Sequence, residues 1–150
     1  GEVKERDFYN NIVKIRENCG DRAVMRAIHF FGDNKRVLQQ TEALQKGDFK
    51  EFLNLIKESG RSSALYLQNI YSCKNPQEQG LSIALALCES ILSNSGAWRV
   101  HGGGFAGTVQ AFVPNNLLDE FSTKMDTVFG AGSCHRLMIR PVGGTEITLP

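Results

Sequence analysis

The sequence predicts an α+β fold in which helices pack on one face of a small, mostly antiparallel sheet. Charge and helical periodicity concentrate in residues 1–95, whereas glycine, proline and period-two apolar runs concentrate in residues 96–150. Of the 33 charged residues, 25 precede position 96, and nine of the 15 glycines follow Ser95. We therefore expect a helical first part, a strand-rich second part, and a second sheet face left for another contact.

Length and composition are those of one globular domain. With 150 residues and no Gly/Ser-rich linker, residues 1–150 have room for a single domain and not for a two-lobed enzyme. A net charge of +1 without a like-charge block argues against nucleic-acid and membrane partners. No apolar run reaches the roughly 18 residues of a membrane span, and the charged start carries no hydrophobic signal region. We expect a cytoplasmic protein.

Two helices are expected before residue 47. The first covers residues 3–18, with Phe8 among its inward-facing positions. The second follows the apolar positions from Ala23 to Leu44, where Gly32 could introduce a kink, and ends at Gly47.

Capping residues predict where the next two helices begin. Asp48 is an N-cap residue with Glu51 three positions later, before a stripe of apolar side chains. Asn75, Pro76 and Glu78 supply the cap, the first helical position and the capping-box carboxylate of the following helix.

The pattern changes to strands after Ser95. Residues 97–101, 108–113 and 134–140 each predict a strand, and a helix is expected to begin at Pro114 and Asn115. The resulting order is strand, strand, helix, strand.

A glycine loop joins the first two expected strands. Gly102, Gly104 and Gly107 match the dinucleotide fingerprint G-x-G-x-x-G, but a strand follows where that fingerprint requires a helix. The loop can be an anion-binding nest, a point of close approach, or a wide hairpin turn, and the pattern alone favours the turn. Alternation along the strand puts Arg99 and His101 on one face, where we expect both to flank the loop.

These residues resemble the third signature motif of the galactokinase branch of the GHMP sugar kinases. Anchored on Gly102, Gly103, Gly104 and Phe105, the motif places the family arginine on Arg99 and its last glycine on Gly107, while His101 replaces a threonine. The resemblance implies a ferredoxin-like C-terminal lobe whose glycine loop helps to close the cleft, with Phe105 packed beneath the loop.

The resemblance continues in order over roughly residues 20–145. Upstream, the family's Arg-Ala-x-His and Glu-Asn-x-Arg patterns match Arg26, Ala27, His29, Asn34 and Arg36, with Asp33 in place of the glutamate. The chain departs from the family after Ser59: a histidine, an arginine and paired aspartates are replaced by residues 60–66, in which Ser62 alone is retained.

The resemblance implies ATP and Mg²⁺ as cofactors of a complete enzyme that phosphorylates the anomeric hydroxyl of galactose or a related monosaccharide. The family's serine-rich phosphate loop and catalytic Asp belong to an N-terminal lobe, and this chain has no such loop. We expect no catalytic residue, no metal site and no tightly bound cofactor here, with the N-terminal lobe as the partner and a homodimer as a further candidate. The start within a predicted helix suggests a cut from that longer enzyme. The alternative is a stand-alone, non-catalytic α+β binding or regulatory module.

Other reactive side chains are assigned structural roles. His29, among apolar neighbours, is interpreted as a hydrogen-bonded packing residue rather than a base. Arg99 is a candidate for phosphate charge neutralisation or for an ordinary ion pair to a helix carboxylate. The four cysteines form no C-x-x-C pair, which predicts reduced thiols, with Cys88 in the core.

Overall fold

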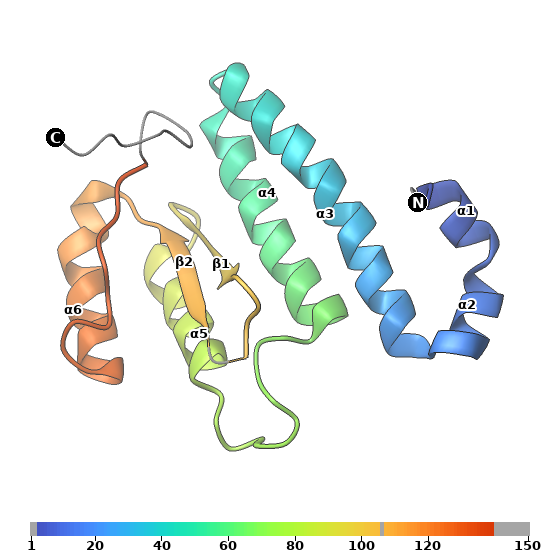
Figure 1. The fold of residues 1–150 in the computed structure, drawn as a ribbon. Coiled ribbons are helices and arrows are strands. Elements are labelled where there is room, and N and C mark those ends of the chain that lie inside the picture. Colours follow the sequence, from blue (N-terminus) through green and yellow to red (C-terminus); the bar gives the residue numbers. More distant parts are fainter. Residues whose placement is uncertain (1–2, 106, 140–150) are drawn as a thin grey trace, which may run out of the picture.

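The computed structural model describes residues 3–105 and 107–139 (Figure 1). A helical part comes first, followed by a hairpin and a last helix. The elements are α1 (Glu5–Asn10), α2 (Ile12–Cys19), α3 (Asp21–Gln45), α4 (Phe49–Ser62), the π-helical turn η1 (Ser63–Leu67), α5 (Gly80–Leu92), β1 (Ala97–His101), β2 (Thr108–Phe112), the short 3₁₀ turn η2 (Asn115–Leu117) and α6 (Leu118–Phe129). Within the described residues, no helix is long and apolar enough to cross a membrane.

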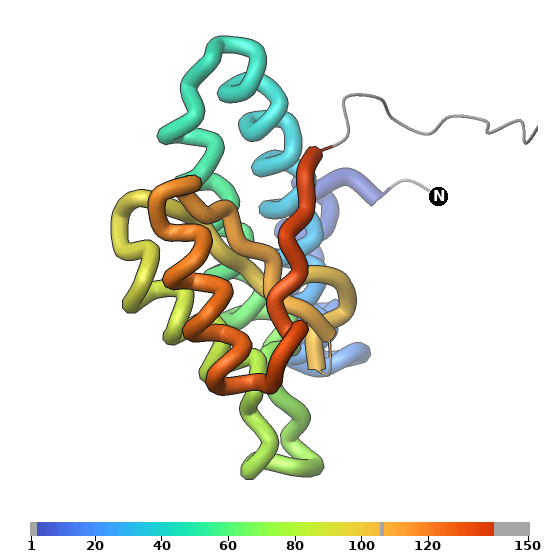
Figure 2. Tube along the Cα trace, turned by 90° about the vertical axis from the view of Figure 1, so that its left-hand side faces the viewer, coloured from blue at the N-terminus to red at the C-terminus, as the bar shows by residue number. Residues whose placement is uncertain are grey.

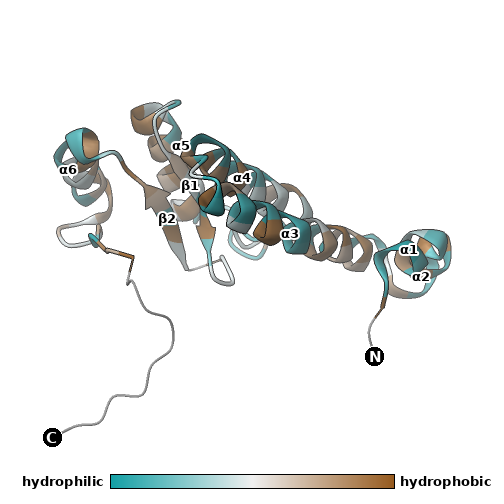
Figure 3. Cartoon of the chain, turned by 90° about the horizontal axis from the view of Figure 1, so that it is seen from above, coloured by the Kyte–Doolittle hydropathy of each residue, from teal (hydrophilic) through white to brown (hydrophobic). Residues whose placement is uncertain are grey.

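The two strands form an antiparallel pair that lies between two layers of helices. Ala97 pairs with Phe112 and His101 pairs with Thr108. The glycine loop therefore connects the strands at the end where His101 and Thr108 lie. One face of the pair buries Ala97 against α4 and α3, in a cluster of Ala43, Phe52, Leu55 and Ile56. The other face packs on α5 and α6, around Cys88, Leu92, Phe121 and Met125. Figure 3 shows α6 and the α3–α4 pair on opposite sides of the strands.

The α+β class and the antiparallel pairing are confirmed. Helices α5 and α6 cover one face of the strand pair, as expected. Helix α4 covers the opposite face, which was expected to be free for another contact. The Asp48 cap is confirmed as well, because its carboxylate accepts a hydrogen bond from the Glu51 N–H at 3.0 Å. Helix α3 continues without a break through Gly32, where a Cβ would lie 3.1 Å from the Arg36 guanidinium. Glycine at this position gives the Arg36 side chain the space to fold back over the helix.

Two of the expected helices differ from the sequence prediction. The expected helix over residues 3–18 is two helices, because Asn11 leaves helical geometry and its side chain donates to the Asp7 carbonyl at 2.8 Å. Helix α5 begins at Gly80 instead of Asn75, because the intervening residues form turns: the Asn75 N–H donates to Ser72 and the Glu78 N–H to Asn75.

The third expected strand, residues 134–140, was wrong over its described part, residues 134–139. This segment lies along α6 instead of beside β2 (Figures 1 and 2). The Asp126 carboxylate accepts the Cys134 N–H at 3.0 Å, and Arg136 contacts Asp119 at 2.6 Å. These side-chain contacts hold the segment against the helix, where it has no strand to pair with. Arg140 lies outside the described residues.

Candidate functional site

The glycine loop is a tight, strained connection between β1 and β2. Gly102 and Gly104 have φ angles of +69° and +76°, which glycine adopts without the steric cost that a Cβ brings. Phe105 also has a positive φ of +59°, an uncommon conformation for a bulky side chain. Because β2 follows the loop, no helix N-terminus is available to hold a pyrophosphate, and the dinucleotide interpretation is excluded.

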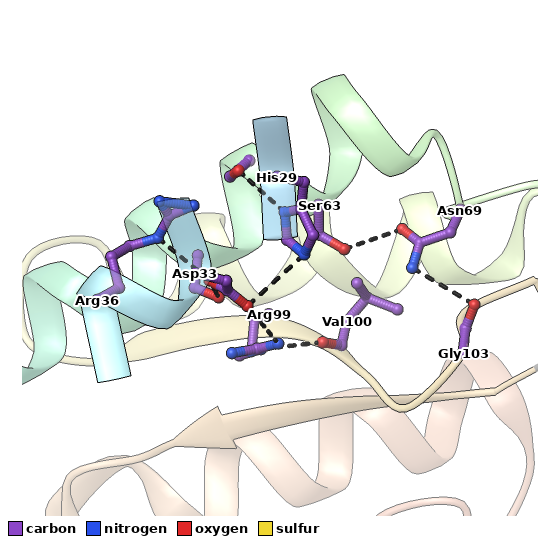
Figure 4. A network of polar contacts seen from close by, with 10 residues as sticks. His29, Asp33, Arg36, Ser63, Asn69, Arg99, Val100 and Gly103 are labelled. Carbon is purple, nitrogen blue, oxygen red and sulfur yellow. Dashed lines mark hydrogen bonds and ion pairs between the residues drawn. The ribbon is translucent and has the colours of Figure 1, made fainter. Parts of the chain in front are cut away.

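Asn69 holds this loop from the segment that follows η1 (Figure 4). It is 3% exposed. Its side chain accepts a hydrogen bond from the Ser63 hydroxyl at 3.0 Å and donates to the Gly103 carbonyl at 3.4 Å. Its backbone carbonyl accepts the Phe105 N–H at 2.6 Å. The loop is therefore fixed by a buried side chain 34 residues earlier, a partner that the sequence analysis did not identify.

The three consecutive glycines have different surroundings. A Cβ on Gly104 would overlap the Asn69 backbone carbonyl and lie 2.8 Å from its side-chain amide. Gly102 and Gly103 have no other atom within 4 Å of such a Cβ. Gly104 is thus required by the fold itself, whereas Gly103 borders open space.

Phe105 is only half-buried in this chain. The residue is 45% exposed. The hydrogen bond to Asn69 and the positive φ of Phe105 fix the backbone in a conformation that leaves much of the ring accessible. The packing of Phe105 beneath the loop, which the galactokinase motif implies for the complete enzyme, stays a prediction.

Arg99 and His101 share a strand face, as alternation predicts, but their side chains have different surroundings. The Arg99 guanidinium lies 4.0 Å from the Asp33 carboxylate, and its Nε donates to the Val100 carbonyl at 3.1 Å. The ion pair to a helix carboxylate is therefore the arrangement found, and the Arg99 charge faces α3 instead of the loop (Figure 4). His101 is exposed at the end of β1, where the loop begins.

Asp33 is the centre of a polar cluster between α3, α4 and β1. Its carboxylate accepts hydrogen bonds from the Ser59 hydroxyl at 2.7 Å and the Arg36 Nε at 3.2 Å, in addition to facing Arg99. His29 lies one turn earlier, with its Nε2 3.6 Å from Asp33 and its Nδ1 3.0 Å from the Ser62 hydroxyl. His29 is buried and hydrogen-bonded, which confirms its structural assignment. The sequence signal for this cluster was the helical spacing of His29, Asp33 and Arg36.

The departure from the galactokinase pattern at Gly60 has a packing reason. A Cβ there would lie 3.1 Å from both the Trp98 carbonyl and the Arg99 Cβ. Helix α4 therefore lies so close to β1 that a side chain at position 60 would need the strand to shift by a few tenths of an ångström.

The environment of His29 predicts that stability depends on pH. Burial lowers the pKa of His29, the charges of Arg36 and Arg99 lower it further, and Asp33 opposes them. The folded chain therefore binds this proton less readily than the unfolded chain, in which the pKa is near 6.5. We expect the urea unfolding midpoint to hold above that pH and to fall as the pH drops towards about 5, where carboxylates begin to titrate. His29→Gln should flatten this fall and His101→Gln should not; equal slopes for both variants would contradict the assignment.

Metal-binding and nucleophilic chemistry find little support in the described part of the chain. No three His, Cys, Asp or Glu side chains are grouped there so that they could hold a metal ion. Burial raises the pKa of the Cys88 thiol to about 12, with a smaller contribution from Cys134, so that thiol is protonated at neutral pH. Cys19 and Cys73 are free thiols on the surface.

Comparison with known proteins gives a distant and partial similarity. A galactokinase of Mannheimia succiniciproducens is 29% identical to this chain over 98 residues, which cover 65% of the chain and 24% of that protein. No family model matches the chain. The matched segment thus spans about a quarter of the length of the curated relative, and the similarity supports a galactokinase-like origin.

Proposed function

We propose that residues 1–150 form the C-terminal lobe of a galactokinase-like sugar kinase, a transferase in which the glycine loop helps to close the cleft for ATP and sugar. The observation that carries the proposal is this loop. Asn69 fixes it from within the fold, yet Gly103 faces open space. A rigid backbone without side chains lets a phosphate group or a facing loop come close. The similarity to galactokinase supplies the reaction class.

The groups that perform phosphoryl transfer would come from the N-terminal lobe. Phosphoryl transfer depends on positioning, Mg²⁺ and charge neutralisation. The Arg99 guanidinium lies 4.0 Å from the Asp33 carboxylate. The proposal therefore assigns Mg²⁺ binding and charge neutralisation to the N-terminal lobe. In this proposal, ATP, Mg²⁺ and a galactose-like sugar bind to the complete cytoplasmic enzyme, and this lobe contributes backbone at the edge of the cleft.

The proposal is tested in the full-length protein encoded by the same gene. Gly103→Val should lower kcat/KM for ATP by roughly 10- to 100-fold, because a side chain would obstruct a close approach. Gly80→Val is the matched control, since Gly80 at the start of α5 also has no other atom within 4 Å of a Cβ. The readout is galactose-dependent ADP formation. Equal kcat/KM values for the two variants would mean that the loop is only a turn between β1 and β2.

An alternative function is a stand-alone binding or regulatory module derived from the same fold. The departure of residues 60–66 from the galactokinase pattern favours it, because Gly60 packs against β1 and the buried Ser63 of η1 donates to Asn69. The two functions predict different coding sequences upstream of Gly1 in the gene. A kinase requires an upstream serine-rich phosphate loop and a catalytic Asp, and the module does not. The kinase proposal also predicts that the isolated chain, supplied with ATP, Mg²⁺ and galactose, shows no turnover; measurable turnover would contradict it.

A further inference from the structure

Helix α3 carries a stripe of exposed apolar side chains. This α3 stripe consists of Phe30, Val37, Leu38 and Leu44, which are between 52% and 72% exposed. Phe30, Val37 and Leu44 follow one another at intervals of seven residues, so they lie along one side of the helix over about 21 Å. Single apolar side chains are normal on a protein surface, whereas a contiguous row of large ones marks an interaction surface.

The neighbouring helices contact other faces of α3. Ala43 faces α4, where it packs in the cluster around Phe52. Phe31 faces α1, and its ring centroid lies 5.4 Å from that of Phe8. Figure 3 shows α4 running along α3, with α1 and α2 at the N-terminal end of the helix. The stripe lies outside both contacts, so a partner for it has to come from another molecule or from another part of a longer chain.

The N-terminal end of the stripe is positively charged. Arg22 and Arg26 are exposed there, and neither forms an ion pair within the described part of the chain. The nearest carboxylate in the sequence, that of Asp21, is engaged by Arg16 instead. Two cations are therefore available to a partner at this end.

The C-terminal end of the stripe, where the chain turns from α3 into α4, has the opposite charge. Asp48 and Glu51 are exposed there, and neither is paired with a cation among the residues that the structure describes. Lys46 is engaged by Glu42 at 2.6 Å, which leaves Lys50 beside the two carboxylates. The surplus charge at this end is negative.

An antiparallel pairing of two copies satisfies the apolar spacing and the charges together. A two-fold axis through Val37 places Phe30 of one copy opposite Leu44 of the other, because both lie seven residues from the axis. The same axis brings Arg26, 11 residues before Val37, to the turn that contains Asp48, 11 residues after it. Each basic end then meets an acidic end, which fixes the orientation of the pair.

We propose that the α3 stripe is an interface between two copies of this chain, packed antiparallel about Val37. A second copy is the partner because the stripe is complementary to itself, in the spacing of its apolar side chains and in the opposite charges of its ends. The interface requires neither ATP nor an N-terminal lobe. It is therefore independent of the proposed kinase function, and the two fail separately.

Light scattering after size-exclusion chromatography of the 150-residue chain tests the interface. We expect a mass of twice 16.6 kDa at roughly 100 μM chain. Val37→Glu should weaken the dimer at least roughly tenfold, because it buries two like charges at the axis. Ile83→Glu is the matched control, since Ile83 is 50% exposed on α5, outside the stripe. A monomer at this concentration would overturn the proposal and leave an N-terminal lobe as the partner of the stripe, and equal effects of the two variants would overturn the location.

Exchange of charges tests the pairing of opposite ends. Arg26→Glu and Glu51→Arg should each weaken the dimer by roughly three- to tenfold, because each places like charges opposite one another. The double variant should recover the affinity, since it restores the attraction with the signs reversed. Glu51 is chosen over Asp48 because the Asp48 carboxylate caps α4. A double variant as weak as the sum of its parts would overturn the antiparallel arrangement.

Cross-linking locates the axis. In a Cys19→Ser, Cys73→Ser background, which removes the exposed native thiols, Val37→Cys should form a disulfide between copies on oxidation with copper–phenanthroline. Its two Cα atoms lie at the axis, within the roughly 7 Å that a disulfide spans. Leu44→Cys should not cross-link, because antiparallel packing separates the two positions by about 21 Å. Equal cross-linking at both positions would indicate parallel packing and overturn the proposal.

Discussion

Alanine at Gly104 is expected to destabilise the chain by about 3 kcal/mol, through backbone strain and a steric overlap together. The φ of +76° costs a residue with a Cβ about 1–2 kcal/mol. The Cβ would also overlap the backbone carbonyl of Asn69, which cannot move away easily because Asn69 is buried and hydrogen-bonded to Ser63. The measurement is the free energy of unfolding from urea titration of the purified chain.

The neighbouring glycines provide matched controls for this substitution. Gly102→Ala should cost about 1 kcal/mol, because its φ is +69° but no other atom lies within 4 Å of the new Cβ. Gly103→Ala should change stability by less than about 0.5 kcal/mol, because Gly103 has no positive φ and no other atom within 4 Å of the new Cβ. The order Gly104, Gly102, Gly103 is the result that identifies Asn69 as the anchor of the loop. Equal losses at Gly102 and Gly104 would mean that strain alone acts and that Asn69 does not hold the loop in solution.

Local features of the fold could be predicted from the sequence. Hydrogen bonds between near neighbours fix the Asp48 cap. Period-two alternation predicted strands at 97–101 and 108–113, and the structure has them at 97–101 and 108–112. The start of α5 was misplaced because Asn75 and Pro76 also suit turns, and the turn hydrogen bonds prevail. The segment 134–139 has strand-like composition, but a strand needs a neighbour to pair with, and α6 offers polar side chains instead.

The sequence predicted the position of the glycine loop but not the residues that contact it. The glycine loop was located by composition and by the galactokinase resemblance, which also drew attention to His29, Asp33 and Arg36. Several contacts that hold these residues join positions far apart in sequence, such as Ser59 with Asp33 and Asn69 with Gly103. Periodicity shows which residues share a face of one helix or strand. It does not show which side chain of another element packs against that face.

Removal of the Asp33 carboxylate should cost the chain about 2 kcal/mol, measured as the free energy of unfolding of Asp33→Ala. Its partner Arg36 is only 14% exposed in its side chain, with its Nη2 buried and lacking a hydrogen-bond partner among the described residues. Breaking a fully buried pair costs roughly 3–5 kcal/mol. The smaller value expected here reflects the 24% exposure of the Asp33 side chain, which lets water replace part of the lost interaction.

A double variant shows whether the loss comes from an uncompensated charge. Arg36→Leu in the Asp33→Ala background should recover part of the stability, because removing both partners of a buried pair costs far less than removing one. Glu42→Ala is the control, since Glu42 pairs with Lys46 on the exposed surface of α3 and its removal should change little. If the double variant were less stable than Asp33→Ala by the full cost of Arg36→Leu alone, the two side chains would be acting independently. The polar cluster would then be a set of separate contacts between α3, α4 and β1, without a shared charge at its centre.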